Sequence, residues 1–361
     1  MREPNVMVVE STVTEVVKSG WTGDVVGVEC LTAGKKDHVS FAVFESDPMF
    51  SVLTYTQYFA PLTLVSDGYA SKFRKAYLPH TPQVRSKFWA LELIDAKLPM
   101  PNHGHVILSS APPILIYQIG THETRILIDI PDKLPSASVA AGGVKGHMAN
   151  VVLPTLPECV RPSFKKALEE GKLRSMPNSF LPPAVQKTPG IVILGDAMNM
   201  RHPLTGGGMT VGFNDVLLLS RLLAPENVPQ FEDTGLVLQQ LRKFHWERKN
   251  RTSVINILAM ALYAMFAADD DRLTKLQKGC FRYFQRGGVC VSEPCGLLAG
   301  IITKPAVLVY HFFSVAVYTV WVLLLEAPLW KKPWVLLVQS VLVLWKAWVL
   351  IMPYIFAEMR S

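Results

Sequence analysis

Two long apolar segments close to the end of the 361-residue chain limit what it can fold into. Residues 305–325 contain no charged side chain, and residues 333–357 are interrupted by Gln339 and Lys346. About 20 apolar residues of helix cross the hydrocarbon core of a bilayer. Each segment is therefore long enough to span a membrane or to lie deep in one leaflet. Together they predict a helical hairpin in or on a membrane, with a pair of buried core helices as the alternative.

Composition and tryptophan placement favour the membrane interpretation. Half of all residues are hydrophobic and 18% are charged, which is too apolar for an ordinary soluble protein of this size. The first 20 residues lack a signal-peptide pattern, so we expect membrane targeting to come from the C-terminus. Tryptophans gather in or near the two apolar segments, as side chains anchored at a membrane interface do: Trp321, Trp330, Trp334, Trp345 and Trp348.

The net charge of +7 does not predict nucleic-acid binding, because the basic residues form no long run. The densest basic stretch, residues 242–251, is helix-like. We expect a solvated helix face there, and in second place a face resting on anionic lipid headgroups. The cysteines lack the paired spacing of metal ligands, so we expect no metal site and reduced thiols in a cytosol-facing protein: Cys30, Cys159, Cys280, Cys290 and Cys295.

Short β-rich runs with turn residues between them fill the first third of the chain. The expected strands are residues 5–17, 24–30, 39–44 and 60–66 in a meander, then 88–93, 105–108, 114–119 and 124–130 in an antiparallel sheet. Helical patterns follow at residues 157–170, after residue 208, at 234–267, and from an Asp269-Asp270-Asp271 cap to Phe284. The pattern predicts an α+β chain with a helical, membrane-attached C-terminal third.

The stretch LGDAMNMRHPLTGGGMTVGFNDV, residues 194–216, carries the strongest chemical signal. The apolar run 191–195 predicts a strand buried on both faces, which places Asp196 at the carboxyl end, where open sheets bind ligands. A carboxylate there can accept hydrogen bonds from a polyol such as the ribityl chain of a flavin. The glycines at 206–208 let the backbone approach a planar ligand, and the following helix directs its free N–H groups at it. On these features alone, a tight strand-to-helix turn is an equally good interpretation.

The full string is more specific than its parts. GDAxNMRHPLTGGGMTV closely resembles the second FAD-binding motif of squalene epoxidases. SDGYASKFRK, residues 66–75, resembles the DG motif of the same family, with Asp67, Gly68, Ser71 and Arg74 at matching positions. Three further segments are similar to that family: PILIYQI, LRSMPNSFLPP and GLLAGIITKPAVLVYHFF at residues 113–119, 173–183 and 296–313. The resemblance to squalene epoxidases therefore runs along nearly the whole chain.

The resemblance implies contacts for individual residues. Asp196 and Met209 match FAD-contacting positions, Val13 matches a strand position beside the adenine, and Asp67 belongs to the DG motif. Gly206, Gly207 and Gly208 complete the implied FAD-binding set. Tyr117 matches a tyrosine of the substrate and inhibitor pocket and is the candidate catalytic residue. The other implied substrate-binding residues, for which ordinary core packing is the alternative, are Pro203, Leu204, Phe281, Phe284, His311 and Phe312.

The implied fold is α+β/α/β. It combines a flavin-hydroxylase-like FAD domain, an antiparallel substrate-domain sheet and a C-terminal membrane helical hairpin. The expected divisions are residues 1–80 for the remainder of the FAD domain with the DG motif, 81–185 for the substrate-domain sheet, 186–225 for the second FAD-binding strand and helix, 226–300 for a helical region, and 301–361 for membrane-associated helices.

The implied reaction is FAD-dependent epoxidation of squalene to (S)-2,3-oxidosqualene with O2, in sterol biosynthesis. Electrons would come from NADPH through NADPH–cytochrome P450 reductase, at the endoplasmic reticulum or microsomal membrane, with the catalytic part facing the cytosol. An alkene has no acidic proton, so the chemistry needs a dry apolar cavity that aligns the olefin rather than an acid–base pair. Membrane lipid is the medium from which a C30 hydrocarbon would enter.

One part of the family pattern does not occur. The family begins with a βαβ unit whose GxGxxG turn binds the FAD pyrophosphate, and the chain contains no strand–GxGxxG–helix sequence. We therefore expect the first half of the cofactor domain to be lacking, and the remaining strands to expose an edge and an apolar face. Three hypotheses stay open: a piece of an active epoxidase, an enzyme with weak flavin binding and low activity, or a truncated, inactive membrane-bound product acting in binding or regulation.

Overall fold

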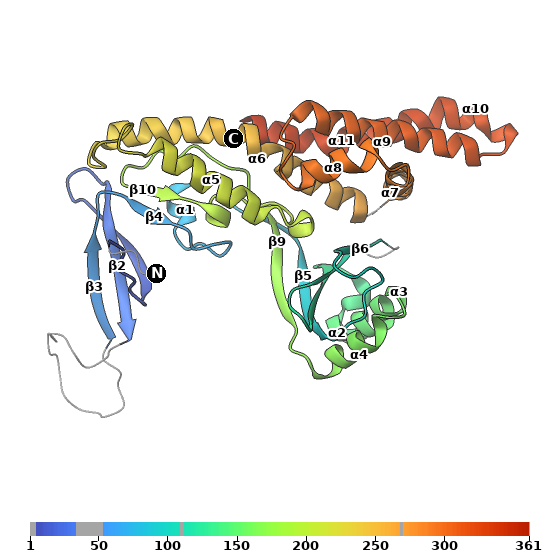
Figure 1. Ribbon diagram of the computed structural model, residues 1–361, viewed down its shortest axis with the longest axis horizontal. Coiled ribbons are helices and arrows are strands. Elements are labelled where there is room, and N and C mark those ends of the chain that lie inside the picture. Colours follow the sequence, from blue (N-terminus) through green and yellow to red (C-terminus); the bar gives the residue numbers. More distant parts are fainter. Residues whose placement is uncertain (1–4, 34–52, 109–111, 268–269, 361) are drawn as a thin grey trace. The chain divides into compact units, whose positions relative to one another are not determined.

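A computed structural model describes residues 5–33, 53–108, 112–267 and 270–360 (Figure 1). The expected strand at 39–44 lies outside these residues. The chain forms two compact units, each built from segments that are separated in the sequence. The first unit comprises Met1–Pro79, Ala184–Met198 and Asp215–Trp246, and the second comprises His80–Pro183, Asn199–Asn214 and Glu247–Ser361.

The strands of the first unit form two small sheets. An antiparallel sheet contains, in this order, β1 (Thr12–Lys18), β2 (Val25–Ala33) and β3 (Leu53–Phe59). The second sheet pairs β4 (Thr63–Val65) in parallel with β10 (Ile191–Ile193). All of β10 is buried, as predicted for a continuous apolar strand. Strands of both sheets expose apolar side chains, because Tyr55 and Phe59 of β3 and Leu64 of β4 are more than half exposed.

The second unit contains the predicted antiparallel sheet. Its five strands lie in the order β6 (His105–Ile107), β7 (Ile114–Gln118), β8 (Glu123–Pro131), β5 (Gln83–Ile94) and β9 (Arg174–Phe180). β9 was not predicted as a strand, because its sequence is polar and contains Pro177. Proline is tolerated on an edge strand, and β9 is the last strand of the sheet.

Short helical turns share a hydrophobic core with this sheet. They are α2 (Gly143–His147), a π turn (Met148–Val152), α3 (Leu153–Thr155) and α4 (Arg161–Glu170). Phe164 of α4 and Met148 are fully buried against Ile126 and Ile128 of β8. The helix expected at 157–170 begins at Arg161, and the turns at 143–155 were not predicted.

Long helices make up the C-terminal part of the chain. They are α5 (Gly208–Leu222), α6 (Thr234–Ala267), α7 (Asp271–Phe284), α8 (Val289–Leu298), α9 (Pro305–Glu326) and α11 (Ser340–Arg360). Asp270 caps α7 as predicted, because its carboxylate accepts a hydrogen bond from the Leu273 N–H at 2.8 Å. Within the second unit, α9 packs against α7 and α11 around a shared apolar core.

The predicted hairpin is present, and its two faces differ. Pro305–Glu326 and Leu329–Arg360 are each long and apolar enough to cross a membrane. Both polar interruptions of the second segment bond to α7 or its cap: Lys346 to Asp270 at 2.5 Å, and Gln339 to Lys275 at 3.2 Å. The five tryptophans are 47–76% exposed. The hairpin therefore has a face tied to the protein and an exposed face suited to lipid.

Candidate functional site

Arg74 joins the two motifs that meet in the first unit. Its Nε donates a hydrogen bond to the Ala197 carbonyl at 2.7 Å. Its Nη2 donates to the carbonyls of Asp196 at 3.0 Å, Gly68 at 3.1 Å and Tyr69 at 2.9 Å. The side chain is 5% exposed, so these carbonyls satisfy a buried guanidinium. Sequence comparison had matched Arg74 to the DG motif without assigning it this role.

The parallel pairing of β4 with β10 brings the two motif carboxylates to one sheet edge. Val65, the last residue of β4, lies opposite Ile193, the last residue of β10. Asp67 and Asp196 therefore follow neighbouring strands at their carboxyl ends, and both side chains are exposed. Burial lowers the pKa of Arg74, and the charges of Asp67 and Asp196 oppose that shift.

A hollow of about 370 Å³ lies beside these residues in the first unit. Val13 and Asp67 both line it, together with Ser66 and Lys72. The hollow thus contains apolar side chains, a carboxylate and a cation, which suits the sugar and heterocycle of a nucleotide. The residues present in this unit fit one part of a flavin nucleotide.

The three glycines of the glycine turn, Gly206 to Gly208, differ in how strictly the structure requires a glycine. Gly206 has φ +65°, a left-handed conformation that other residues rarely adopt. A Cβ on Gly207 would lie 2.6 Å from Ile255 Cγ2 of α6, which is too close. A Cβ on Gly208 would meet only the Arg201 guanidinium at 3.8 Å. α5 begins at Gly208, and Met209 in its first turn is 73% exposed, so the start of the helix is open to a ligand.

A buried polar network lies directly before the glycine turn. His202 stacks on Tyr263 with ring centroids 3.7 Å apart, and its Nδ1 accepts a hydrogen bond from the Leu204 N–H at 3.2 Å. Burial lowers the pKa of His202 to about 3, so the ring is neutral, and its 3.9 Å separation from Asp129 is not an ion pair. The Asp129 carboxylate instead accepts hydrogen bonds from Ser86 at 2.5 Å and Asn178 at 2.8 Å. The network fixes the backbone that leads into the turn.

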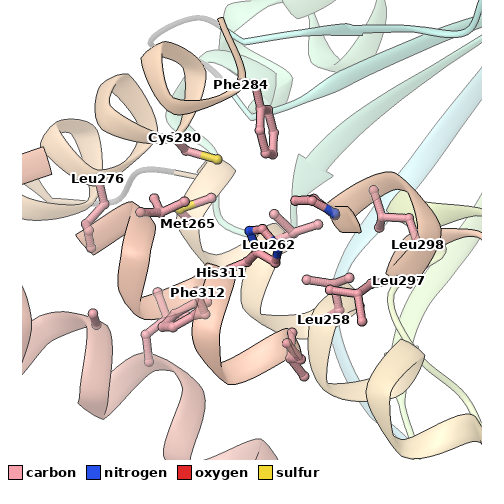
Figure 2. Close-up of a pocket in the computed structure, with 15 residues that line it drawn as sticks. Leu258, Leu262, Met265, Leu276, Cys280, Phe284, Leu297, Leu298, His311 and Phe312 are labelled. Atoms are coloured by element: carbon pink, nitrogen blue, oxygen red, sulfur yellow. The ribbon is translucent and has the colours of Figure 1, made fainter. Parts of the chain in front are cut away.

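An apolar cavity of about 50 Å³ lies among the helices of the second unit (Figure 2). Figure 2 shows side chains of several helices pointing toward one another around His311. The predicted residues that line it are Phe284, His311 and Phe312. Lining residues not predicted include Leu258, Leu262, Met265, Cys280, Leu297 and Leu308. Their spacing on α6, at 258, 262 and 265, is the periodicity that could have indicated a shared helix face.

The cavity wall holds polar groups only in paired or neutral form. His311 bonds through Nδ1 to the Tyr283 hydroxyl at 2.9 Å and through Nε2 to Glu293 at 2.6 Å. Burial raises the pKa of the Cys280 thiol to about 12, so it stays protonated and apolar. A space of about 50 Å³ holds a few water molecules, so a C30 hydrocarbon enters only if the helices move apart.

Tyr117 lies on the sheet rather than in this cavity. It lines a separate hollow of about 400 Å³ together with Arg125 and Arg174. Tyr117 also packs against an apolar cluster that contains Leu204, and Leu262 of the cavity wall packs against the same cluster. Tyr117, Leu204 and the cavity-wall residue Leu262 therefore share one apolar cluster.

The remaining predicted substrate-binding residues, Pro203 and Phe281, do not line the cavity. Pro203 is half-buried in the short turn before Gly206. Phe281 is 58% exposed and is not among the residues that line the cavity. Cys280 and Phe284 share a helix face because they are four residues apart, and Phe281 is rotated about 100° away from Cys280.

Comparison with solved structures defines the class of protein. The fold is similar to that of Klebsiella pneumoniae HpxO, crystallised with FAD and uric acid, with a TM-score of 0.56 over 82% of this chain and 67% of that one. The identity of 17% means that this similarity shows the fold alone. The chain has the flavin-hydroxylase-like fold of FAD-dependent monooxygenases, with an antiparallel sheet and two apolar C-terminal helices.

Sequence comparison identifies the family within that class. The squalene epoxidase family model matches residues 59–337. A squalene epoxidase of Aspergillus fumigatus is 59% identical over 98% of this chain and 69% of its own length. A squalene monooxygenase of Mus musculus is 44% identical over 83% of this chain and 51% of its own length. The chain belongs to the squalene epoxidase family.

Proposed function

We propose that the chain carries out FAD-dependent epoxidation of squalene to (S)-2,3-oxidosqualene. One atom of O2 enters a terminal double bond, and the other leaves as water with two electrons and two protons. The observation that carries the proposal is the 59% identity to a squalene epoxidase over nearly the whole chain. NADPH–cytochrome P450 reductase is the proposed electron donor, at the endoplasmic reticulum membrane with the catalytic part in the cytosol. The exposed face of the apolar hairpin supports a membrane location.

FAD, when bound, would supply the two-electron redox chemistry and the activation of O2. The proposed contacts in the first unit are Val13 and Asp67, supported by the hollow that they line, and Asp196, supported by the pairing of β10 with β4. Those in the second unit are Gly206, Gly207, Gly208 and Met209, supported by the open start of α5. Helix N–H groups and their positive dipole end favour an anionic group, such as reduced flavin or a phosphate.

The chain's own contribution on the substrate side is exclusion of water. Phe284, His311 and Phe312 are the proposed substrate contacts in the cavity, and Tyr117, Pro203 and Leu204 those beside it. Apolar walls hold an olefin by dispersion and keep water from reactive oxygen species. Phe281, predicted from the sequence as a substrate contact, is left out of the proposed set because it is 58% exposed and does not line the cavity.

The first experiment measures flavin binding by residues 1–361 purified in detergent. Saturable binding with squalene turnover in the presence of the reductase is the expected result. A folded chain without flavin binding would favour the inactive, membrane-bound alternative. Asp196→Ala is expected to abolish flavin binding, and unchanged flavin content in that variant would contradict the assignment of Asp196.

Phe284 and Phe281 offer a matched pair for the substrate site. Both are phenylalanines of α7, and one lines the cavity while the other is exposed. Phe284→Ala is expected to raise the squalene KM by about tenfold, because it removes a large apolar contact. Phe281→Ala is expected to leave it unchanged. Equal effects of the two substitutions would overturn the assignment of the cavity.

A further inference from the structure

Four buried polar residues link the last turn of α11 to the glycine turn. Glu358 Oε1 accepts a hydrogen bond from Asn256 Nδ2 at 2.8 Å, and the same amide nitrogen also donates to Asn199 Oδ1 at 3.1 Å. Arg201 Nη2 donates to the same Asn199 oxygen at 3.1 Å. Arg201 Nη1 in turn lies 3.5 Å from the Gly208 carbonyl. Each of the four side chains is at most 7% exposed, so they form a buried hydrogen-bond chain.

The direction of these bonds follows from the groups themselves. The Glu358 carboxylate only accepts hydrogen bonds, so the amide NH2 group of Asn256 must point toward it. Asn199 donates its own Nδ2 to the Leu181 carbonyl at 2.8 Å, which leaves its oxygen for donors. That oxygen accepts from Arg201 and also from Arg248 at 3.2 Å. The chain runs from a carboxylate to a guanidinium, so the bonds at its two ends are charge-assisted and the Asn256–Asn199 bond between them is neutral.

Packing by the same turn of α6 supports the glycine turn independently. Ile255, the neighbour of Asn256, occupies the space that a Cβ on Gly207 would need, at 2.6 Å. It also lies against Gly300, where an added Cβ would be 2.9 Å from Ile255 Cδ1. One turn of α6 therefore contacts Gly207 by packing and is linked to Gly208 by the hydrogen-bond chain.

We propose that Glu358 and Asn256 are positioning residues that hold the glycine turn, so that the seating of the apolar hairpin sets the shape of the turn. Glu358 belongs to the same helix as Trp345 and Trp348, which are 61% and 47% exposed on the face suited to lipid. Displacement of α11 by its membrane contacts would pull on the hydrogen-bond chain. The effect of the turn on flavin rests on the proposed function, whereas the link between α11 and the turn does not.

Hydrogen exchange in the full chain tests the link without any cofactor. The reporters are the Gly206 N–H, bonded to the Pro203 carbonyl at 3.0 Å, and the Val211 N–H, bonded to the Gly207 carbonyl at 3.1 Å. Glu358→Leu and Asn256→Ala are each expected to speed exchange at these amides by about tenfold, the effect of losing one charge-assisted hydrogen bond. Glu358→Gln keeps an accepting oxygen without the charge, so it is expected to speed exchange less than Glu358→Leu does.

Ser253→Ala is the matched control. Ser253 also lies on α6 and donates to Glu358 Oε2 at 2.9 Å, but it is outside the hydrogen-bond chain. It is expected to leave exchange at the turn unchanged. Native exchange in both Glu358→Leu and Asn256→Ala would overturn the proposal, and so would equal acceleration by Ser253→Ala. The double variant Glu358→Leu/Asn256→Ala is expected to match a single variant, and additive effects would contradict one continuous chain.

FAD titration of the same variants tests the consequence for the site. Glu358→Leu is expected to weaken FAD binding by about tenfold, in step with the loss of protection. Faster exchange with unchanged FAD affinity would overturn the effect on flavin while leaving the link in place. A wild-type chain that binds no FAD would instead contradict the proposed function, with the exchange results still deciding the link.

Discussion

The guanidinium of Arg74 donates a hydrogen bond of 2.7 Å to the backbone carbonyl of Ala197, 123 residues later in the chain. Through the same side chain, the segment after β4 and the segment after β10 are fixed to each other. Two motifs that are separate in the sequence therefore depend on one cation for their geometry.

Arg74→Lys is expected to destabilise the first unit although the charge is kept. A lysine ammonium cannot reproduce donation from Nε and Nη2 to carbonyls on both segments, and buried carbonyls left without donors cost about 1–3 kcal/mol each. We expect a clear drop in the urea midpoint. Arg282→Lys, at an exposed ion pair with Glu326, is the control and should change the unfolding free energy by less than about 0.5 kcal/mol.

Gly207→Ala is expected to destabilise the glycine turn by steric overlap with Ile255. Adding Ile255→Ala to this variant should recover part of the loss, because it removes the overlapping methyl group. Gly208→Ala adds the same group with room for it, so its thermal midpoint should stay close to the wild type. Equal destabilisation by the two alanines would show that overlap is not the cause.

His202 is expected to make the protein less stable as the pH falls below 6.5. Burial lowers its pKa to about 3, so between these values the unfolded chain binds a proton that the folded chain does not. The unfolding free energy should drop by up to about 1.4 kcal/mol per pH unit, or about 2 kcal/mol at pH 5. Urea titrations at pH 7.5, 6 and 5 should show this slope, and His202→Phe should flatten it.

His122 provides the comparison of opposite sign. Its hydrogen bond to the Asp95 carboxylate raises its pKa, so it favours the folded state at low pH and loses that effect as the pH rises. His122→Gln should therefore steepen the loss of stability on acidification, or leave it unchanged because the pair is exposed. A flattened slope in His122→Gln would contradict the assignment to His202.

Removing Asp270 alone is expected to destabilise the protein more than replacing both Asp270 and Lys346. Asp270 caps α7 and pairs with the single lysine within the apolar face of α11. Asp270→Ala removes the cap, worth about 1 kcal/mol, and leaves Lys346 without this partner. Asp270→Ala/Lys346→Leu should recover thermal stability in detergent relative to Asp270→Ala. A double variant less stable than the single one would contradict this.

Local pattern in the sequence determined the strongly periodic elements. The apolar run at β10, the helix after Gly208, the cap at Asp270 and the two C-terminal apolar segments could all be predicted, because each is set by side chains close together in the chain. β9 could not, because its polar sequence with Pro177 becomes a strand only by pairing with β5.

The exact motif string also determined the family, but the tertiary structure decided what the residues do. The order of residues in the sequence does not reveal that Arg74 bonds to Ala197, that Ile255 requires a glycine at 207, or that Lys346 pairs with Asp270. Phe281 and Phe284 look equivalent in the sequence, and only the rotation of α7 exposes one and buries the other against the cavity. Contacts between distant segments depend on how helices and strands pack, and that packing is decided by many residues along the whole chain together.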